Sequence, residues 1–402
     1  MKTNKLLIKT KKGLSKDIQN ILPDYEPKLN KSRRFIPVCA PDIRGNELKY
    51  VKDCLSTNWI SSAGSYVKRF ENSFSHACQT KYGVSCSSGT AALHLALASL
   101  GIGPGDEVIV PTFTMIATAN TVVYTGAKPV FVDADQNTWN IDSSLIEKSI
   151  TKKTKAIIVV HTYGYPADME TVVALARKHC LFVIEDACEA HGATYKGKSV
   201  GSLADVACFS FYGNKILTTG EGGMLVTNKK NIADIARTLR DHGFSKRRHF
   251  WHEHVGFNYR MTNLQAAIGL AQTERINQLV RHRIENAKLY KKCLKGIKGI
   301  VFPPESSDRG NVFWLYTVLI EKSFKVSRNN LRCLLADEGI ETRPVFIPVH
   351  LQPVYYQDCF SGHFPVAEDL CSRGLCLPSA GLLLKKHIEL IAGLINKYSD
   401  QR

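Results

Sequence analysis

A regular alternation of short apolar runs with longer amphipathic segments constrains the fold of this 402-residue chain most strongly. The apolar runs are rich in β-branched and aromatic residues and predict buried strands at 82–86, 107–110, 129–132, 155–160, 181–185 and 206–211. The segments between them predict helices at 89–100, about 114–125, 143–149 and 168–179. Strands joined by helices of this length are typical of an α/β fold, with a mostly parallel sheet that helices cover on both faces.

The pattern changes after about Gly299, which predicts a second and smaller α+β domain. In this part we expect strands at 312–320 and 341–348 and helices at 327–338 and about 385–398. Further helices are expected at 46–55, 66–77, 230–241 and 262–295; the first is capped by Asn46 and has Leu48, Val51 and Leu55 on one face. We therefore expect a large domain over 35–285 and a small C-terminal domain over 286–402.

Residues 1–34 form a basic leader with ten Lys or Arg and three Asp or Glu, in a chain whose net charge is +17. The leader lacks the apolar stretch of a secretory signal, so we expect a solvated, poorly ordered extension. The positive excess of the remaining chain suits an anionic ligand. We expect no nucleic-acid partner, because no basic stripe alternates with aromatic residues. No membrane span is expected either, because no apolar run approaches about 18 residues.

Twelve cysteines are scattered along the chain without a C-x-x-C pair or a paired Cys/His spacing. This distribution argues against a zinc site and against a disulfide framework. Reduced thiols of this kind fit a cytoplasmic protein, and we expect no metal.

A loop lysine, Lys215, follows the predicted strand 206–211, and the glycines at 220, 222 and 223 after it allow close backbone approach. A lysine on a structured loop at the end of a core strand can be desolvated. Desolvation favours the neutral amine, which is the form that condenses with an aldehyde cofactor. An ordinary surface lysine is the alternative interpretation.

Two other segments carry possible chemistry at the ends of strands. Ser88, Gly89 and Thr90 lie where a strand meets a helix, a position that binds anions through backbone N–H groups; an ordinary N-cap is the alternative. Asp186 ends an apolar strand, at the edge where α/β sheets bind ligands. The alternative for Asp186 is a cap on a following helix.

Three motifs in this order resemble one known family. They are E-D-A-x-x-A-H-G at 185–192, F-S-F-x-x-x-K-x-L-x-x-G-E-G-G at 209–223 and G-x-N-x-R at 256–260. The chain resembles the DegT/DnrJ/EryC1/StrS sugar aminotransferases, which use pyridoxal 5′-phosphate (PLP), from about Phe35 to the C-terminus. The resemblance implies the type I fold of PLP-dependent aminotransferases.

The resemblance also implies roles for single residues. Lys215 would form the imine with PLP, Asp186 would pair with the pyridine nitrogen, and Glu189 stands where the family usually has glutamine beside the ring hydroxyl. The implied phosphate contacts are Ser88, Gly89, Thr90 and Ser210.

For the other contacts that the resemblance implies, ordinary packing is the alternative interpretation. Met115 falls at the position of the aromatic residue that lies over the ring, with Phe113 as a core residue. Asn258 would reach the cofactor phosphate of the neighbouring subunit, which implies a homodimer with shared active sites. Trp59 and His350 lie in segments that line the sugar-nucleotide pocket of relatives.

The implied reaction is amino transfer from glutamate to a nucleotide-linked 4-keto-6-deoxy sugar. Segments such as T-W-N-I-D at 138–142 favour GDP-4-keto-6-deoxymannose, whereas relatives that use UDP- or dTDP-linked sugars share most of the motifs. Deoxygenating members carry histidine at the lysine position, so Lys215 argues against that activity. A regulatory relative that binds PLP without turnover is the non-enzyme alternative.

Overall fold

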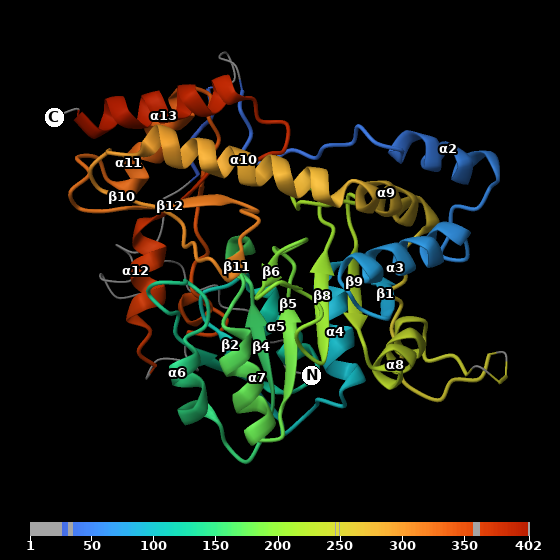
Figure 1. The fold of residues 1–402 in the computed structure, drawn as a ribbon. Coiled ribbons are helices and arrows are strands. Elements are labelled where there is room, and N and C mark those ends of the chain that lie inside the picture. The colour runs from blue at the N-terminus through green and yellow to red at the C-terminus, as the bar shows by residue number, and fades with distance from the viewer. Residues whose placement is uncertain (1–25, 31–34, 246, 249, 357–361, 401–402) are drawn as a thin grey trace, which may run out of the picture.

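The computed structural model describes residues 26–30, 35–245, 247–248, 250–356 and 362–400. Its central strands are β1 (Tyr82–Cys86), β2 (Glu107–Pro111), β3 (Lys128–Val132), β4 (Thr154–Val160), β5 (Phe182–Asp186), β8 (Val206–Ser210) and β9 (Gly223–Thr227). They form one seven-stranded sheet in the order β1-β9-β8-β5-β4-β2-β3 (Figure 1). Neighbours from β3 to β8 pair in parallel, whereas β9 is antiparallel to both β8 and β1. The predicted mostly parallel sheet is therefore confirmed.

Helices cover both faces of this sheet. Successive residues of each strand point to opposite sides, so each strand places apolar side chains under both helix layers. In β4, Ala156 and Ile158 belong to one apolar cluster, while Ile157 and Val159 belong to another. The first face is covered by α4 (Gly89–Ser99), α5 (Ala117–Tyr124) and α8 (Lys230–Arg240). The second is covered by α3 (Ser65–Ala77), α6 (Ser143–Ile146), α7 (Met169–Lys178) and α9 (Asn263–Glu274).

A second, antiparallel sheet lies in the C-terminal part of the chain (Figure 1). Its strands are β10 (Ile300–Val301), β12 (Tyr316–Ile320), β14 (Gly374–Leu377) and β13 (Arg343–Pro344), in that order. The helices α10 (Ile276–Leu294), α11 (Arg328–Asp337) and α13 (Lys385–Asp400) pack with it around a separate apolar cluster. This arrangement agrees with the predicted α+β character; because α10 spans residue 285, the boundary there stays a proposal.

Some strands and helices of the C-terminal part differ from the prediction. The strand expected over 312–320 begins only at Tyr316, because Phe313 has φ 48°, which an extended strand excludes. The strand expected over 341–348 is reduced to β13. The sequence pattern missed α12 (Pro365–Arg373), β14 and a small three-stranded sheet of β6 (Thr194–Tyr195), β7 (Lys198–Ser199) and β11 (Arg309–Gly310).

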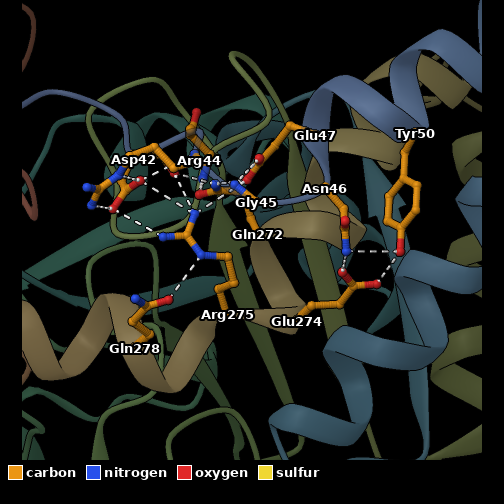
Figure 2. A network of polar contacts seen from close by, with 11 residues as sticks. Asp42, Arg44, Gly45, Asn46, Glu47, Tyr50, Gln272, Glu274, Arg275 and Gln278 are labelled. Carbon is orange, nitrogen blue, oxygen red and sulfur yellow. Dashed lines mark hydrogen bonds and ion pairs between the residues drawn. The ribbon is translucent and has the colours of Figure 1, made fainter.

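The helix predicted over 262–295 is in fact two helices, α9 and α10, which meet at Arg275. Arg275 has φ −113° and ψ 9°, outside helical geometry, and its guanidinium lies 3.3 Å from the Asp42 carboxylate. Asp42 also binds Arg44, and the hydrogen bond from Arg44 together with the charge of Arg275 lowers the pKa of Asp42 to about 2, against the opposing effect of burial. Figure 2 shows how these groups and Glu47 converge on the helix junction.

The helix α2 (Glu47–Ser56) precedes α3 and packs on α9. Of the apolar side chains expected on one face of this helix, Leu48 and Leu55 are 67% and 56% exposed, whereas Val51 is half-buried. Asn46 occupies the N-cap position without a side-chain cap; its amide instead donates to Glu274 at 2.7 Å (Figure 2). The residues that α2 buries are Glu47 and Cys54.

Most of the basic leader lies outside the described residues, so its predicted disorder is not addressed by the structure. Within the described part of the leader, Glu26 pairs with the buried Arg332 of α11 at 2.9 Å. Among the described residues, no helix is long and apolar enough to cross a membrane.

Candidate active site

A cavity of about 480 Å³ lies at the carboxyl edge of the large sheet. Segments that follow β1, β2, β5 and β8 line it on one side, and residues of the C-terminal part line it on the other. Eight of the eleven predicted site residues meet there: Ser88, Gly89, Thr90, Met115, Asp186, Glu189, Ser210 and Lys215. Open α/β sheets bind their ligands at this edge, so this cavity is the candidate active site.

Lys215 lies on the loop after β8, where its backbone N–H donates to Tyr212 O at 2.9 Å. Its side chain is half-buried, and its Nζ lies 3.6 Å from the centroid of the Trp314 ring. The positive charge of Lys215 lowers the pKa of Glu189, which shows that the amine shares the cavity with this carboxyl.

Asp186 ends β5 and is 5% exposed. Its Oδ2 accepts a hydrogen bond of 2.7 Å from Thr118 Oγ1 on α5, and its Oδ1 accepts one of 3.2 Å from Cys188 N. A turn rather than a helix follows Asp186, so its interpretation as a helix cap was wrong. The two hydrogen bonds hold a buried carboxylate in one orientation toward the cavity.

Glu189 is a second buried carboxyl in the cavity. Burial raises its pKa to about 7, against the opposing effects of the Lys215 charge and of a hydrogen bond of 2.7 Å from Tyr163 N. The neighbouring charge of Asp186 raises the pKa further. Near neutral pH this group therefore exchanges a proton readily, unlike an amide at the same place.

The N-terminus of α4 faces the same cavity. Ser88 is its N-cap and accepts a hydrogen bond of 3.0 Å from Ala91 N. A Cβ added at Gly89 would lie 2.6 Å from Ser210 Cβ, so only glycine allows the helix end and the β8 end to approach this closely. Backbone N–H groups in the first turn of a helix lack helical partners and attract anions. This end of the cavity is suited to a phosphate.

The family comparison agrees with this geometry. The model of the DegT/DnrJ/EryC1/StrS aminotransferase family matches residues 41–396. The chain belongs to this family. Its members are aminotransferases, and the fold class predicted from the sequence resemblance is confirmed.

Several relatives are similar to this chain over nearly their whole length. GDP-perosamine synthase of Escherichia coli O157:H7 is 48% identical over 92% of this chain and 100% of that protein. GDP-perosamine synthase of Caulobacter vibrioides is 46% identical, over 90% of this chain and 98% of its own. The GDP-perosamine synthase of Vibrio cholerae is 40% identical over 90% of this chain and 99% of its own.

Solved structures of the family superpose closely. DesV of S. venezuelae is 35% identical, with a TM-score of 0.85 over 90% of this chain and 99% of its own. The PLP form of a putative sugar aminotransferase of Streptococcus pneumoniae has a TM-score of 0.85 at 29% identity, covering 91% of this chain and 99% of its own.

Three residues predicted for the family site do not line the cavity of their own chain. Trp59 is 57% exposed, and Asn258 is exposed with its Oδ1 accepting from Arg260 Nε at 3.0 Å. His350 is buried, with Nδ1 2.6 Å from Thr112 Oγ1 and Nε2 3.2 Å from a Glu368 oxygen. Burial lowers the pKa of His350 to about 4, so the structure places a neutral imidazole in packing rather than in the cavity.

Met115 and Phe113 are the two candidates for the position at which the family has an aromatic residue over the ring, and their surroundings differ. Met115 lines the cavity and is half-exposed, whereas Phe113 is buried against the edges of Tyr163 and Phe346. A thioether can pack on the face of a ring, so Met115 rather than Phe113 is available to a ligand.

Sequence reasoning missed three residues that line the cavity: Thr118, Trp314 and Arg343. Thr118 follows Met115 by three residues, so its place near the strand end could have been inferred. Trp314 and Arg343 come from the C-terminal part and carry no local signal. Within the described ranges, no group of three or more His, Cys, Asp or Glu could hold a metal ion, and the eleven cysteines described there are free.

Proposed function

We propose that this protein uses PLP to transfer an amino group from glutamate to C4 of GDP-4-keto-6-deoxymannose, giving GDP-perosamine. The observation that carries the proposal is the meeting of the Lys215 amine, the buried Asp186 carboxylate and the N-terminus of α4 in one cavity. An amine, an acid and an anion site are the three groups that an aldehyde cofactor with a pyridine ring and a phosphate needs.

The residues of the cavity fit this cofactor. The first turn of α4, with Ser88, Gly89 and Thr90, would hold the phosphate together with Ser210, where Gly89 keeps the approach open. Asp186 would pair with the ring nitrogen, and Met115 would contact the ring. Bound PLP supplies an electrophilic carbon for the amine and a ring that accepts the electrons of a broken C–H bond.

The chain itself would supply the proton transfers. As a neutral amine tethered in the cavity, Lys215 Nζ would take the proton from Cα of glutamate and later return a proton to the sugar carbon. Thr118 and the Cys188 N–H keep Asp186 oriented by donating to its two oxygens. Glu189 would hold or release a proton beside the reacting amine, because its pKa lies near 7.

The choice of sugar nucleotide is supported by the relatives. The three GDP-perosamine synthases are 40% to 48% identical over 90% or more of this chain. A UDP-linked alternative has support of its own, because a UDP-N-acetyl-3-dehydro-alpha-D-glucosamine 3-aminotransferase of Acidithiobacillus ferrooxidans is 42% identical over 79% of this chain. We favour the GDP-linked substrate because its relatives match over more of the chain.

We further propose that the enzyme is a cytoplasmic homodimer with shared active sites. Exposed apolar side chains concentrate in residues 43–60, where Ile43, Leu48, Leu55, Trp59 and Ile60 are all exposed. A concentration of this kind is typical of an interface. Trp59 and Asn258 would then complete the cavity of the partner, which agrees with their absence from the lining of the cavity of their own chain.

The test is an end-point assay with glutamate and GDP-, UDP- or dTDP-linked 4-keto-6-deoxy sugars, with identification of the amino sugar formed. We expect GDP-perosamine from the GDP-linked substrate and no product with Lys215→Ala. Amination of only a UDP- or dTDP-linked sugar would contradict the assignment of the GDP-linked substrate. If PLP binds but glutamate does not change its absorbance, a regulatory role is favoured instead. A relative named pleiotropic regulatory protein, from Geobacillus stearothermophilus, is 41% identical over 78% of this chain.

A further inference from the structure

Trp314 contacts Lys215 in two different ways. Lys215 Nζ lies over the face of the Trp314 ring, 3.6 Å from its centroid. Trp314 Nε1 donates a hydrogen bond of 2.9 Å to the carbonyl oxygen of Asn214, the residue that precedes Lys215. One side chain thus holds both the tip of Lys215 and the peptide that carries it.

The surroundings of Trp314 make this contact rigid and largely dry. Trp314 is 5% exposed, and its ring stacks on Tyr163 with centroids 6.2 Å apart and planes 19° apart. Tyr163 stacks in turn on Phe346, with centroids 5.0 Å apart and planes 7° apart. Cation–π attraction strengthens when water is excluded, so the Trp314 ring is a specific binding place for the Lys215 ammonium.

The backbone around Trp314 is also held in an unusual conformation. Tyr163 has φ 54° and Phe313 has φ 48°, values that bulky residues adopt rarely and only where the surroundings hold them. The two segments are joined by Trp314 N donating to Tyr163 O at 3.0 Å and Val312 N donating to Gly164 O at 3.2 Å. These two hydrogen bonds fix the segment that carries Trp314, so its indole ring is held at the cavity.

We propose that Trp314 is a positioning residue that holds the Lys215 ammonium in the form of the enzyme whose cofactor carries the amino group. The inference rests on the proposed function. In a transamination cycle the lysine is free while the cofactor carries the amino group, and it is covalently bound while the cofactor is an aldehyde. A ring that binds only the free ammonium therefore stabilises the aminated form of the enzyme relative to the aldehyde form.

The experiment measures the equilibrium between these two forms in the holoenzyme, without any sugar nucleotide. Wild type, Trp314→Leu and Trp314→Phe are titrated with mixtures of glutamate and 2-oxoglutarate, and cofactor absorbance gives the ratio at half conversion. We expect Trp314→Leu to need a glutamate to 2-oxoglutarate ratio roughly 5- to 30-fold higher than wild type, the range of a desolvated cation–π contact. Trp314→Phe keeps a weaker aromatic face and should shift the ratio by less.

Trp139→Phe is the matched control, because Trp139 is equally buried in the core and lies outside the cavity. It should leave the ratio unchanged. A second readout uses the cofactor-free protein: reductive methylation of Lys215, followed by peptide mass spectrometry, should be faster in Trp314→Leu than in wild type and in the control. Should Trp314→Leu not fold, Trp314→Phe carries both readouts.

The outcomes separate this inference from the proposed function. Normal conversion by glutamate with equal ratios in all four proteins would overturn the role of Trp314 and leave the aminotransferase intact. Absence of any conversion in wild type would contradict the proposed function, and the methylation rates would then decide alone whether Trp314 holds Lys215. Equal methylation rates in that case would overturn the inference too.

Discussion

Glu189 gives the cavity a second titrating carboxyl close to Asp186. The two acids have different partners. Asp186 accepts hydrogen bonds from Thr118 and Cys188, whereas Glu189 accepts one from Tyr163 N. Burial dominates at Glu189 and raises its pKa to about 7.

Replacing this carboxyl by an amide, Glu189→Gln, should change how stability depends on pH. The folded pKa of about 7 lies above the ordinary value of 4.5, so the folded protein keeps a proton that the unfolded chain releases between these values. Wild-type stability therefore falls as pH rises from 4.5 to 7, by up to about 3 kcal/mol from this group. Urea unfolding of cofactor-free protein should show Glu189→Gln gaining about 1–3 kcal/mol on wild type between pH 5 and 8.

The control for this prediction is Glu170→Gln, an exposed carboxylate that pairs with Lys196 on the surface. It should change stability by the same amount at both pH values. Parallel pH profiles of wild type and Glu189→Gln would show that Glu189 is ionised in the folded protein throughout this range.

At the scale of single residues, the local pattern pointed to Lys215 and Asp186 but not to Trp314. The first two lie at the ends of buried strands, and strand ends of a parallel sheet gather at one edge. Trp314 reaches the cavity from the C-terminal part, through the positive φ of Phe313. That conformation depends on tertiary contacts, which short-range periodicity does not encode.

Among the secondary-structure elements, the junction of α9 and α10 is the feature that the sequence pattern concealed. A break in a helix is usually signalled by proline or glycine, and Arg275 is neither. The break instead follows a network in which Arg275 pairs with the buried Asp42 and Gln272 Nε2 donates to Glu47 at 2.7 Å (Figure 2). Partners some 230 residues apart in the chain cannot be read from the 262–295 segment alone.

Removing the Arg275 charge should destabilise the protein by leaving Asp42 with Arg44 as its remaining cation. The Asp42 side chain is 2% exposed, while that of Arg44 is 60% exposed, so solvent screens the Arg44 charge more than that of Arg275, which is 16% exposed. We expect Arg275→Met to lower the free energy of unfolding by about 2 kcal/mol in urea titrations. The double variant Asp42→Asn/Arg275→Met should recover part of this loss, because the unpaired charge is gone.

A double variant that is no more stable than Arg275→Met would contradict a role for the ion pair. Arg44→Met is the matched control, since it removes an exposed partner of the same carboxylate and should cost less than Arg275→Met.

For the whole molecule, the exposed apolar surface of residues 43–60 carries the proposal of a dimer. These side chains lie on α2 and on the segments just before and after it, and Leu48 and Leu55 are 67% and 56% exposed in their own chain. The sequence pattern placed these leucines on one face of the helix, and helical periodicity reveals an apolar face without revealing what covers it. Burial between two subunits produces the same pattern as burial within one.

Charges on this face should therefore separate the subunits. We expect Leu48→Asp/Leu55→Asp to convert the dimer to a monomer in light scattering after gel filtration, and to lose amino transfer if Asn258 serves the partner's cavity. Leu390→Asp, on a leucine of α13 that is 49% exposed, should leave both the mass and the activity unchanged. A dimer that persists in the doubly charged variant would place the interface elsewhere.

The most direct test of the account is chemical capture of the cofactor at Lys215. Protein loaded with PLP is reduced with borohydride and digested, and the peptides are mapped by mass spectrometry. We predict a reduced PLP adduct on Lys215 that disappears in Lys215→Ala and remains in Lys229→Ala, a variant of an exposed lysine. An adduct on another lysine, or none at position 215 while the protein still aminates its sugar substrate, would contradict the central claim.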